Sequence, residues 1–400
     1  MQQKTLLRHC SICDATVGAV IHTQRFQLSE GHLLPSFCDY VVCEECGFAF
    51  SDTPVDQAGY DAYYAGMSKY ADSATSTGAG VLPWDKARLD GLADQVADFC
   101  VNRRARIVDI GCANGGLLAA LQAKGFQNVC GIDPSPACVE ATRNLARGEA
   151  WVGTLARIPE EVGTFDGIIL SHVMEHVRDL AAAMELVHRL LNPGGWVYIE
   201  VPDASRYEEF LVAPFQDFNT EHINHFSETS LANLCRRNRF FPERSGTKII
   251  HSSKDMPYPA LFWFARKSDE CLPIVKDEVL RGDLEKYIGA SHALMARIDG
   301  NISRLITEYP EVIVWGTGQL TMKLLADTCL RTARISAFVD GNPINQGKIM
   351  HGAKVIAGSE ITAGDTPILV CSLINEASIL EAIRALNLPN PVVTLLKGVE

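Results

Sequence analysis

The sequence of 400 residues lacks the features of several large classes of protein. No apolar run approaches the roughly 18 residues of a membrane-spanning helix, and the N-terminus, MQQKTLLRHCSIC, has no apolar signal segment. Basic residues are few, since 36 Lys and Arg stand against 48 Asp and Glu, and the net charge of -12 disfavours binding to a nucleic-acid backbone. We therefore expect a cytoplasmic protein with no membrane or nucleic-acid partner, whose thirteen cysteines are reduced or metal-bound.

Four of the cysteines form two C-x-x-C pairs, Cys10 with Cys13 and Cys43 with Cys46. Each pair can clamp one metal ion between two thiolates, so the two pairs predict a tetrahedral Cys₄ site for structural Zn²⁺. The alternative, two redox motifs, is disfavoured because neither pair opens a helix after a strand. Short alternating apolar stretches predict a small hairpin sheet, and we place the zinc-binding module at residues 1–57.

Residues 58–84 begin with several tyrosines, Tyr70 among them, and continue as a run of Ser, Thr and Gly. Such a segment is either a linker with a few packing tyrosines or a mobile lid over a ligand site. In a lid, a tyrosine could donate its O–H to a substrate. Composition alone leaves both interpretations open.

The stretch Ile107–Gly116, IVDIGCANGG, indicates a buried strand that ends in an acid and continues as a loop of small residues. The residues after the loop have helical periodicity and close on Gly125. A strand, a glycine loop and a helix N-terminus form a cradle in which the backbone can approach a nucleotide-type ligand. Roughly 20 residues further on, a second strand ends in Asp133, where an acid can bind both ribose hydroxyls.

Two further strands follow, in FDGIILSHVMEHV and LNPGGWVYIEVPD. A glycine loop alone could be an ordinary turn, but these four motifs in this order resemble the class I S-adenosylmethionine (SAM) methyltransferases over residues 85–269. The pattern G-x-x-x-G-G disfavours a dehydrogenase, whose loop is G-x-G-x-x-G. The resemblance implies SAM as cofactor and a SAM site formed by Asp109, Gly111, Cys112, Ala113, Asn114, Gly115, Asp133, Pro134, Thr154, Leu155, Ser171 and His172.

Histidines and carboxylates gather after the fourth and fifth strands. Glu175 and His176 are expected in the first turn of the next helix, and a metalloprotease-type site is disfavoured because H-E-x-x-H is absent. The long loop after the fifth strand carries Glu221 and His222, at the end of the sheet where ligands bind. A histidine can remove a proton near neutral pH, and a neighbouring carboxylate orients it. The alternative is that these residues only hydrogen-bond within a wet loop.

The C-terminal third of the sequence begins with residues 270–308, which are charged and amphipathic. They predict a helical connector, either a bridging helix pair or a dimer seam. In residues 309–400 a second strand–loop–helix unit contains Gly316 and Gly318, and its next strand ends in Asp340. This pattern predicts a smaller Rossmann-like domain, in which the missing third glycine disfavours a bound dinucleotide.

The complete order of motifs resembles the sugar-nucleotide methyltransferases, a family that includes deoxysugar C-methyltransferases of antibiotic pathways. It consists of a Cys₄ module, a tyrosine-bearing linker, a SAM domain with E-H-x-x-x-F-S after strand five, and a Rossmann-like C-terminal domain. The resemblance implies an α/β fold with a class I methyltransferase sheet and a C-terminal domain that helps to hold a nucleotide-linked sugar.

The same resemblance implies a set of catalytic residues. His222 would be the general base, assisted by Glu221, Tyr70, Asn219 and His225. Two of these depart from the family, which has a tyrosine in the region of Asn219 and an aromatic residue at the position of His225.

The resemblance favours C-methylation as the reaction. We expect the protein to be a monomer or a homodimer. O-methylation of a sugar hydroxyl is the first alternative. A zinc-containing RNA methyltransferase is disfavoured by the acidic balance and the lack of Lys and Arg clusters. A non-catalytic SAM- or nucleotide-binding protein is disfavoured by the loop that carries Glu221 and His222.

Overall fold

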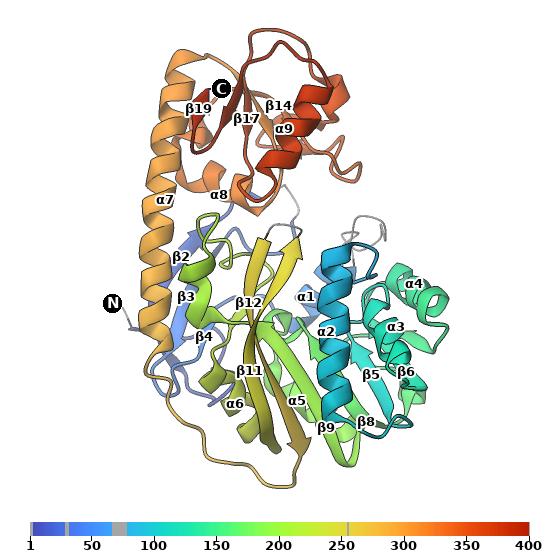
Figure 1. Cartoon of the computed structure of the whole chain (residues 1–400). Coiled ribbons are helices and arrows are strands. Elements are labelled where there is room, and N and C mark those ends of the chain that lie inside the picture. Colours follow the sequence, from blue (N-terminus) through green and yellow to red (C-terminus); the bar gives the residue numbers. More distant parts are fainter. Residues whose placement is uncertain (1–2, 29–31, 66–77, 254–255, 400) are drawn as a thin grey trace. The chain divides into compact units, whose positions relative to one another are not determined.

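The computed structural model describes residues 3–28, 32–65, 78–253 and 256–399 (Figure 1). They form two compact units. The first contains Met1–Ile21, Val41–Phe210 and Glu221–Asp283, and the second contains His22–Tyr40, Leu211–Thr220 and Leu284–Glu400. The division differs from the predicted domain boundaries, because two short segments from the first 220 residues belong to the second unit.

The N-terminal sheet has five strands, in the order β1 (Gln3–Thr5), β2 (Val17–Arg25), β3 (Phe37–Cys43), β4 (Ala49–Ser51) and β10 (Asn224–His225). The alternating apolar stretches of the N-terminal region thus form strands, as predicted. The last strand, β10, comes from the long loop and pairs antiparallel with β4, with Asn224 opposite Phe50. The residues directly after Glu221 and His222 are therefore held in a sheet.

The central sheet of the first unit has seven strands in the order β11, β12, β9, β8, β5, β6 and β7. The strands from β9 to β7 are parallel, and β12 and β11 continue the sheet antiparallel at one edge. Their bounds are β5 (Arg106–Ile110), β6 (Asn128–Asp133), β7 (Ala150–Val152), β8 (Phe165–Ser171), β9 (Leu191–Pro202), β11 (Phe240–Ser253) and β12 (Met256–Lys267). The predicted α/β fold with a Rossmann-like sheet is confirmed.

Helices cover both faces of this sheet, because its central strands are apolar on both sides. On one face, Ile107 packs in a core with α2 (Pro83–Phe99) and α3 (Gly116–Ala123), which lie side by side in Figure 1. On the other face, Val108 and Ile110 pack with α5 (Leu180–Leu190) and α6 (Glu228–Arg237). Two further helices, α1 (Gln57–Ala65) and α4 (Pro136–Ala146), precede α2 and follow β6 in the chain. Because parallel strands end at one edge, the loops after β5, β6, β8 and β9 meet there.

The second unit contains a second sheet, in the order β15, β16, β14, β13, β17, β18 and β19, which is parallel from β16 to β18. It agrees with the predicted Rossmann-like C-terminal domain. Its strands are β13 (Val312–Trp315), β14 (Ile335–Val339), β15 (Ile349–Met350), β16 (Ala353–Ile356), β17 (Ile368–Val370), β18 (Val392–Thr394) and β19 (Gly398–Val399), and its helices α7 (Leu280–Glu308), α8 (Gln319–Asp327) and α9 (Glu376–Ala385).

The connector predicted to be helical over residues 270–308 is helical only from Leu280, where α7 begins. Pro273 lies in the non-helical part, and proline disfavours a helical conformation in the residue before it. Asp277 then caps the helix, since its Oδ1 accepts hydrogen bonds from the N–H groups of Val279 and Leu280, both at 3.0 Å. The connector is one continuous helix and not a helix pair.

The expectation of a helix that starts with Glu175 and His176 is wrong. Residues Met174–His176 form a single 3₁₀ turn, and α5 starts only at Leu180, where Asp179 caps it. His172 has a φ of 56°, in the left-handed region, and this breaks the chain direction before any helix can form. His172, Glu175 and His176 therefore lie on an irregular turn at the end of β8.

Gly47, directly after the second C-x-x-C pair, has a φ of 77° and no room for a side chain, because a Cβ there would lie 2.1 Å from the carbonyl oxygen of Asp277. We expect Gly47→Ala to lower the free energy of unfolding by about 3 kcal/mol, through backbone strain and this clash. Urea unfolding measures the change. Gly282→Ala is the matched control, since a Cβ at Gly282 in α7 meets nothing within 4 Å and alanine favours a helix. Equal losses in the two variants would contradict the expectation.

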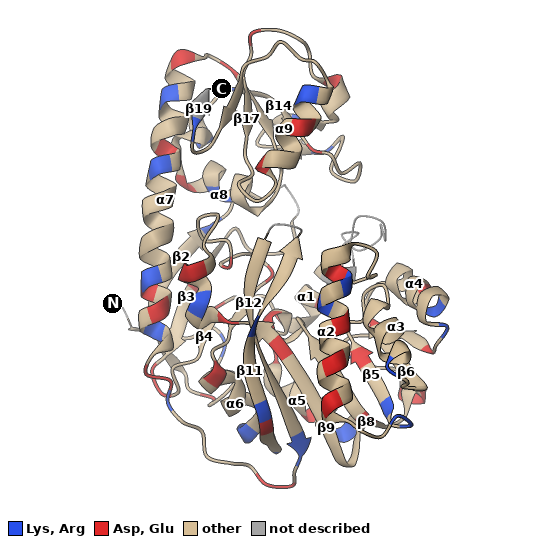
Figure 2. Ribbon diagram, in the orientation of Figure 1, with Lys and Arg blue, Asp and Glu red and all other residues tan. Residues whose placement is uncertain are grey.

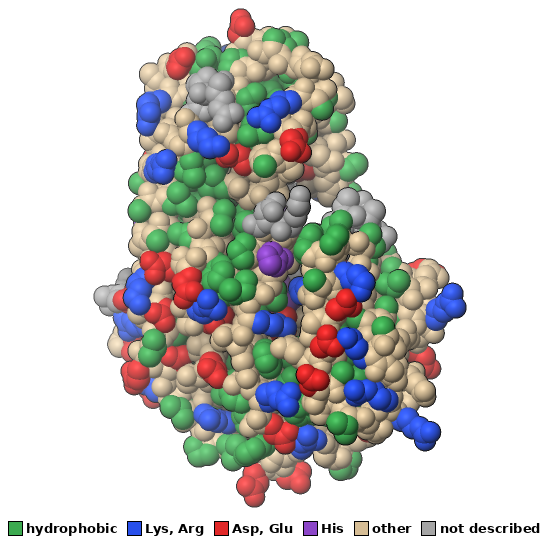
Figure 3. Space-filling view, in the orientation of Figure 1, with side chains coloured by type: hydrophobic (Ala, Val, Ile, Leu, Met, Phe, Trp, Pro, Cys, Tyr) green, Lys and Arg blue, Asp and Glu red, His purple; other side chains and the backbone are tan. Residues whose placement is uncertain are grey.

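Charged residues are mixed over the surface of the described chain. Acidic residues recur along α2, as Asp90, Asp94 and Asp98 (Figure 2). On the face drawn in Figure 3, Lys and Arg side chains lie among Asp and Glu and form no basic stripe of the kind that follows a nucleic-acid backbone. Within the part of the chain that the structure describes, no helix is long and apolar enough to cross a membrane.

Candidate active site and metal centre

The two C-x-x-C pairs come together in the first unit. The Sγ atoms of Cys10, Cys13, Cys43 and Cys46 all lie within 4.8 Å of one another, with 3.6 Å between Cys10 and Cys46 and 3.4 Å between Cys13 and Cys43. Four thiolates with Zn–S bonds of about 2.3 Å are roughly 3.8 Å apart at the corners of a tetrahedron. The four side chains therefore fit one Cys₄ metal site. None of the thirteen cysteines, all of which the structure describes, forms a disulfide.

Both cysteine pairs stand on the same type of backbone turn. The N–H of Asp14 donates to the carbonyl of Cys10 at 2.8 Å, and the N–H of Gly47 donates to the carbonyl of Cys43 at 3.0 Å. Asp14 and Gly47 both adopt a left-handed φ, at 66° and 77°. Two equivalent turns aim the thiolates of each pair at the same point. Cys38 is buried as well and is not part of the cluster.

The loop after β5 has the backbone that its glycines predict. Gly111 and Gly115 have φ values of 84° and 81°, and α3 begins directly after Gly115. A Cβ at Gly115 would lie 2.8 Å from the Cα of Thr142, so no other residue fits without movement. The N–H of Ala113 donates to Asp133 Oδ2 at 2.9 Å. The loop is thus tied to the acid at the end of β6, and the N-terminus of α3 opens beside it.

A cavity of about 450 Å³ opens beside this loop, and its volume suits a small-molecule ligand. Among the described residues, most of the predicted cofactor-binding residues line it: Asp109, Gly111, Cys112, Ala113, Asp133, Pro134, Thr154, Leu155, Ser171 and His172. Asn114 and Gly115 are not part of the lining. Gly115 instead forms the N-cap of α3, and Asn114 is buried.

Sequence reasoning missed the residues that α1 and α2 contribute to the cavity. Gln57 and Asp61 come from α1, and Trp84 and Arg88 come from α2. The hydroxyl of Thr154 donates to Asp61 Oδ2 at 3.4 Å, so a carboxylate lies beside this predicted cofactor contact. The tyrosines of residues 58–84 suggest a lid, but nothing in the sequence indicates that Asp61, which lies among them in α1, lines the cavity.

Two buried carboxyl groups face the cavity. Burial and, to a smaller extent, the charge of Asp133 together raise the pKa of Asp109 to about 7. Burial also raises the pKa of Asp133 to about 6, although N–H groups of Ser135 and Ala113 donate to it and act in the opposite direction. A bound cation or hydroxyl donor would favour the ionised form of both groups. The site is therefore suited to a ligand with an ammonium group and a diol.

A buried network of charges lies next to the cavity at His172. Its Nδ1 donates to Glu175 Oε1 at 3.1 Å, and its Nε2 lies 3.2 Å from Glu200 Oε1. Burial alone would lower the pKa of His172, but the two carboxylates outweigh burial and raise the pKa to about 9. His172 is consequently a cation at neutral pH.

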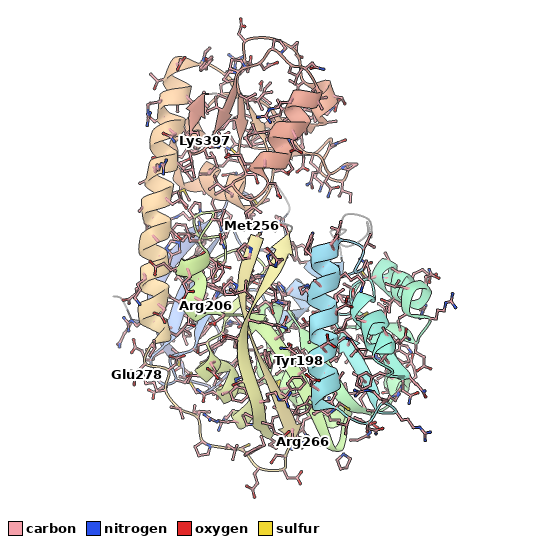
Figure 4. The ribbon with its side chains drawn as sticks, in the orientation of Figure 1. Tyr198, Arg206, Met256, Arg266, Glu278 and Lys397 are labelled. Carbon is pink, nitrogen blue, oxygen red and sulfur yellow. The ribbon has the colours of Figure 1, made fainter. Side chains whose placement is uncertain are left out.

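Glu200 is held from the other side by two residues of the sheet. Lys248 of β11 forms an ion pair with it, and Tyr198, labelled on β9 in Figure 4, donates its O–H to it. Burial would raise the pKa of Glu200, but Lys248 and His172 outweigh burial and hold the pKa below its usual range. Sequence reasoning missed this network, although a single glutamate inside the apolar run WVYIEVP was a signal for it.

The predicted catalytic residues occupy different environments. Glu221 lines the cavity, and the ring of His222 lies 5.0 Å from that of His176, which lines the cavity as well. His225 is buried in β10, where its Nδ1 lies 3.3 Å from the hydroxyl of Tyr207. Burial lowers the pKa of His225 to about 3, so its ring is neutral near pH 7.

The structure does not test the roles of the remaining two predicted catalytic residues, Asn219 and Tyr70. Asn219 belongs to the second unit, where its Nδ2 donates to the carbonyl of Gln216 at 3.2 Å. Tyr70 lies outside the described residues. Their predicted roles stay predictions.

Residues 84–240 match the family model of a methyltransferase domain. This segment is a class I SAM-dependent methyltransferase domain. The match starts in α2 and ends at the first residue of β11, so the methyltransferase domain contains the Gly111 loop and Asp133 together with Glu221 and His222.

Curated relatives of the chain are methyltransferases as well. It is 36% identical over 100 residues to a ubiquinone biosynthesis O-methyltransferase of Pseudomonas aeruginosa (strain UCBPP-PA14), which covers 24% of this chain and 43% of that protein. It is 26% identical over 151 residues to the protein of the same name from Paracidovorax citrulli (strain AAC00-1), which covers 34% and 62%. The chain therefore spans less than two thirds of the length of these relatives.

Solved structures that resemble the chain include two methyltransferases. One is the 1,6-didemethyltoxoflavin-N1-methyltransferase of Burkholderia thailandensis, with a TM-score of 0.41 and 20% identity, covering 57% of this chain and 98% of that chain. The other is the magnesium protoporphyrin IX methyltransferase of Synechocystis PCC 6803, with a TM-score of 0.38 and 18% identity, covering 46% and 83%.

The raised pKa of Asp109 leads to a pH dependence of SAM binding by the methyltransferase domain. In the free protein the carboxyl ionises only near pH 7, and the ammonium group of bound SAM is expected to favour the carboxylate. The affinity should therefore rise about tenfold between pH 5 and 7 and level off above the free-protein pKa. Calorimetric titration with SAM measures this. Asp109→Asn should bind more weakly and with less pH dependence, and an unchanged slope in that variant would show that another group is responsible.

Proposed function

We propose that the protein is a SAM-dependent methyltransferase that transfers a methyl group to a nucleotide-linked sugar. The observation that carries the proposal is the position of the E-H pair, since Glu221 lines the cavity beside the predicted SAM residues and the ring of His222 stacks edge-on against His176. The acidic composition and the absence of a basic stripe on the face of Figure 3 favour a small acceptor over RNA.

In this proposal the residues of the first unit divide the work between holding SAM and removing a proton. The Gly111 loop and Asp133 hold SAM, which supplies an electrophilic methyl group. His222, oriented by Glu221, takes a proton from the acceptor carbon or oxygen as that atom attacks the methyl. Alignment of two bound reactants can contribute roughly 7–11 kcal/mol, and general base action about 100- to 10,000-fold.

A second candidate is methylation of an oxygen. The curated relatives are named O-methyltransferases, and the predicted base could serve either a hydroxyl or an acidic C–H group. We favour carbon, because a sugar C–H next to a carbonyl needs a strong and well-oriented base more than a hydroxyl does.

For the Cys₄ site we propose a structural Zn²⁺. Four cysteine thiolates can fill all four positions of a tetrahedral zinc ion, as in structural zinc sites, and the site lies in the same core as β5 and β8. A catalytic zinc would keep one position open for a substrate or water.

For the second unit we propose binding of the nucleotide part of the acceptor by the loop between β13 and α8. Gly316 in this loop has a φ of 114°, and the adjacent Thr317 hydroxyl donates to Asp340 at the end of β14. Asn345 also donates to Asp340, at 3.0 Å. The carboxylate is thus fixed at the end of a parallel strand, where ligands of such sheets bind.

The test is incubation with methyl-labelled SAM and a panel of nucleotide sugars, both keto and hydroxyl forms, with phenolic acceptors and RNA as further arms. We expect label in a nucleotide sugar, and NMR of the product locates the methyl on carbon or oxygen. Label only in a phenol or in RNA would overturn the proposed acceptor, and label nowhere would overturn the enzymatic proposal.

A further inference from the structure

The buried network at the end of β8 continues beyond His172 toward the predicted base. Glu175, the next carboxylate in the chain of contacts, is 1% exposed. Its Oε1 accepts from His172 Nδ1, and its Oε2 is buried with no hydrogen-bond partner among the described residues. A buried carboxylate oxygen without a donor costs free energy, and its negative charge favours a proton on an ionisable group beside it.

His176 and His222 lie next to the carboxylate of Glu175. One ring nitrogen each of His176 and His222 and a carboxylate oxygen of Glu175 lie within 4.8 Å of one another. His176 Nε2 is 4.0 Å from Glu175 Oε1. Glu175 is therefore the carboxylate that faces both rings.

The tautomer of His176 follows from its other nitrogen. Nδ1 lies 3.0 Å from the carbonyl oxygen of Glu221, which can only accept, so Nδ1 carries the hydrogen. In the neutral ring, Nε2 then presents a lone pair toward the carboxylate. A proton that arrives on this histidine pair would replace the repulsion between this lone pair and the carboxylate by an attraction between opposite charges.

We propose that Glu175 is a positioning residue for the reaction, the buried counter-charge for the proton that His222 removes from the acceptor. The inference rests on the proposed function. One proton leaves the acceptor and binds a ring nitrogen of His222, a bond forms between the acceptor atom and the methyl carbon, and the S–CH₃ bond breaks to give neutral S-adenosylhomocysteine. The positive charge that leaves the sulfur thus reappears as the imidazolium of His222, and the Glu175 carboxylate stabilises it.

The rest of the network holds Glu175 in place for this role. His172 is clamped between Glu175 and Glu200, and Glu200 is fixed by Lys248. Glu200 thus has two cationic neighbours, Lys248 and His172, whereas Glu175 has His172 and the histidine pair, with its Oε1 4.0 Å from His176 Nε2. The other charged and titratable groups of the packed elements are His172, Glu200, Lys248 and Tyr198 in the network, Glu221, whose carbonyl accepts from His176, His225 of β10, and Arg8, which donates to the carbonyl of Ile223.

The test reads the proton affinity of His222 directly and needs no acceptor. Protein labelled with ¹⁵N-histidine and saturated with S-adenosylhomocysteine is titrated by NMR, with His222→Asn used to assign the signal. We expect Glu175→Gln to lower the pKa of His222 by about one unit, a tenfold loss of proton affinity, because a nearby negative charge favours the imidazolium. Glu175→Asp should retain most of the wild-type value.

Glu161→Gln, a matched substitution of an exposed glutamate, should leave the pKa of His222 unchanged. A pKa of His222 that is the same in wild type and Glu175→Gln would overturn the proposal. Loss of the His176 and His222 signals on addition of micromolar Mn²⁺ would also overturn it, because that result would assign Glu175, His176 and His222 to a cation site. No methyl transfer is measured in this titration, so its result does not depend on whether a nucleotide sugar is the acceptor.

Discussion

Replacing Cys43 by serine is expected to abolish stoichiometric zinc binding and to lower the melting temperature by about 10 °C or more. Cys43 ends β3, and its Sγ is 3.4 Å from that of Cys13. Loss of one of four thiolates leaves an incomplete site, and structural zinc contributes roughly 10–16 kcal/mol of binding free energy that is coupled to folding.

The effect should extend beyond the N-terminal module. Cys10, Cys43 and Cys46 belong to the same core as Val108 of β5 and Ile168 of β8, so an unfolded module exposes one face of the central sheet. We therefore expect one cooperative loss of structure in the first unit, with weaker SAM binding, and not the unfolding of an independent tail.

Metal analysis and thermal unfolding by circular dichroism measure the two expected changes. Cys271→Ser is the matched control, because Cys271 is exposed and outside the cluster, and serine can keep its hydrogen bond to the carbonyl of Arg237. Zinc bound at full stoichiometry in Cys43→Ser, or an equal fall of the melting temperature in both variants, would contradict a structural Cys₄ zinc site.

The parts of the site that the sequence could predict are those in which short-range spacing decides the structure. The two C-x-x-C pairs come together because each forms its own tight turn, at Asp14 and Gly47. Asp133 reaches the Gly111 loop because parallel strands β5 and β6 end side by side. In these cases a spacing of a few residues, or one strand–helix repeat, determines which atoms meet.

The parts that the sequence could not predict depend on contacts between distant segments. Glu200 meets Lys248 only because β12 pairs with both β9 and β11, which fixes the face and register of three strands. The backbone of Asp277 packs against Gly47, and Asp277 lies in the part of the connector that has no regular secondary structure. Glu175 was expected at the start of a helix, because helical spacing does not reveal the left-handed φ of His172. Local patterns thus give the elements, and tertiary packing decides which charges they bring together.

The second large effect is expected at the predicted base: His222→Asn should lower kcat by about 100- to 10,000-fold and leave the affinity for SAM within about twofold. Asparagine keeps a polar side chain of similar reach but cannot take a proton near neutral pH. His222 is not among the residues that line the SAM cavity, whereas Glu221 and His176 are, so loss of its ring should leave the cofactor contacts intact.

Turnover with the acceptor that the labelling panel identifies and calorimetric titration with SAM separate the two quantities. His351→Asn is the matched control, since His351 is an exposed histidine of the second unit with a left-handed φ of 46° that asparagine also tolerates. Near-normal turnover in His222→Asn would exclude a general base at this position and assign proton removal to another group. A parallel fall of turnover and SAM affinity would instead mean that the E-H loop supports the cofactor cavity and does not act on the acceptor.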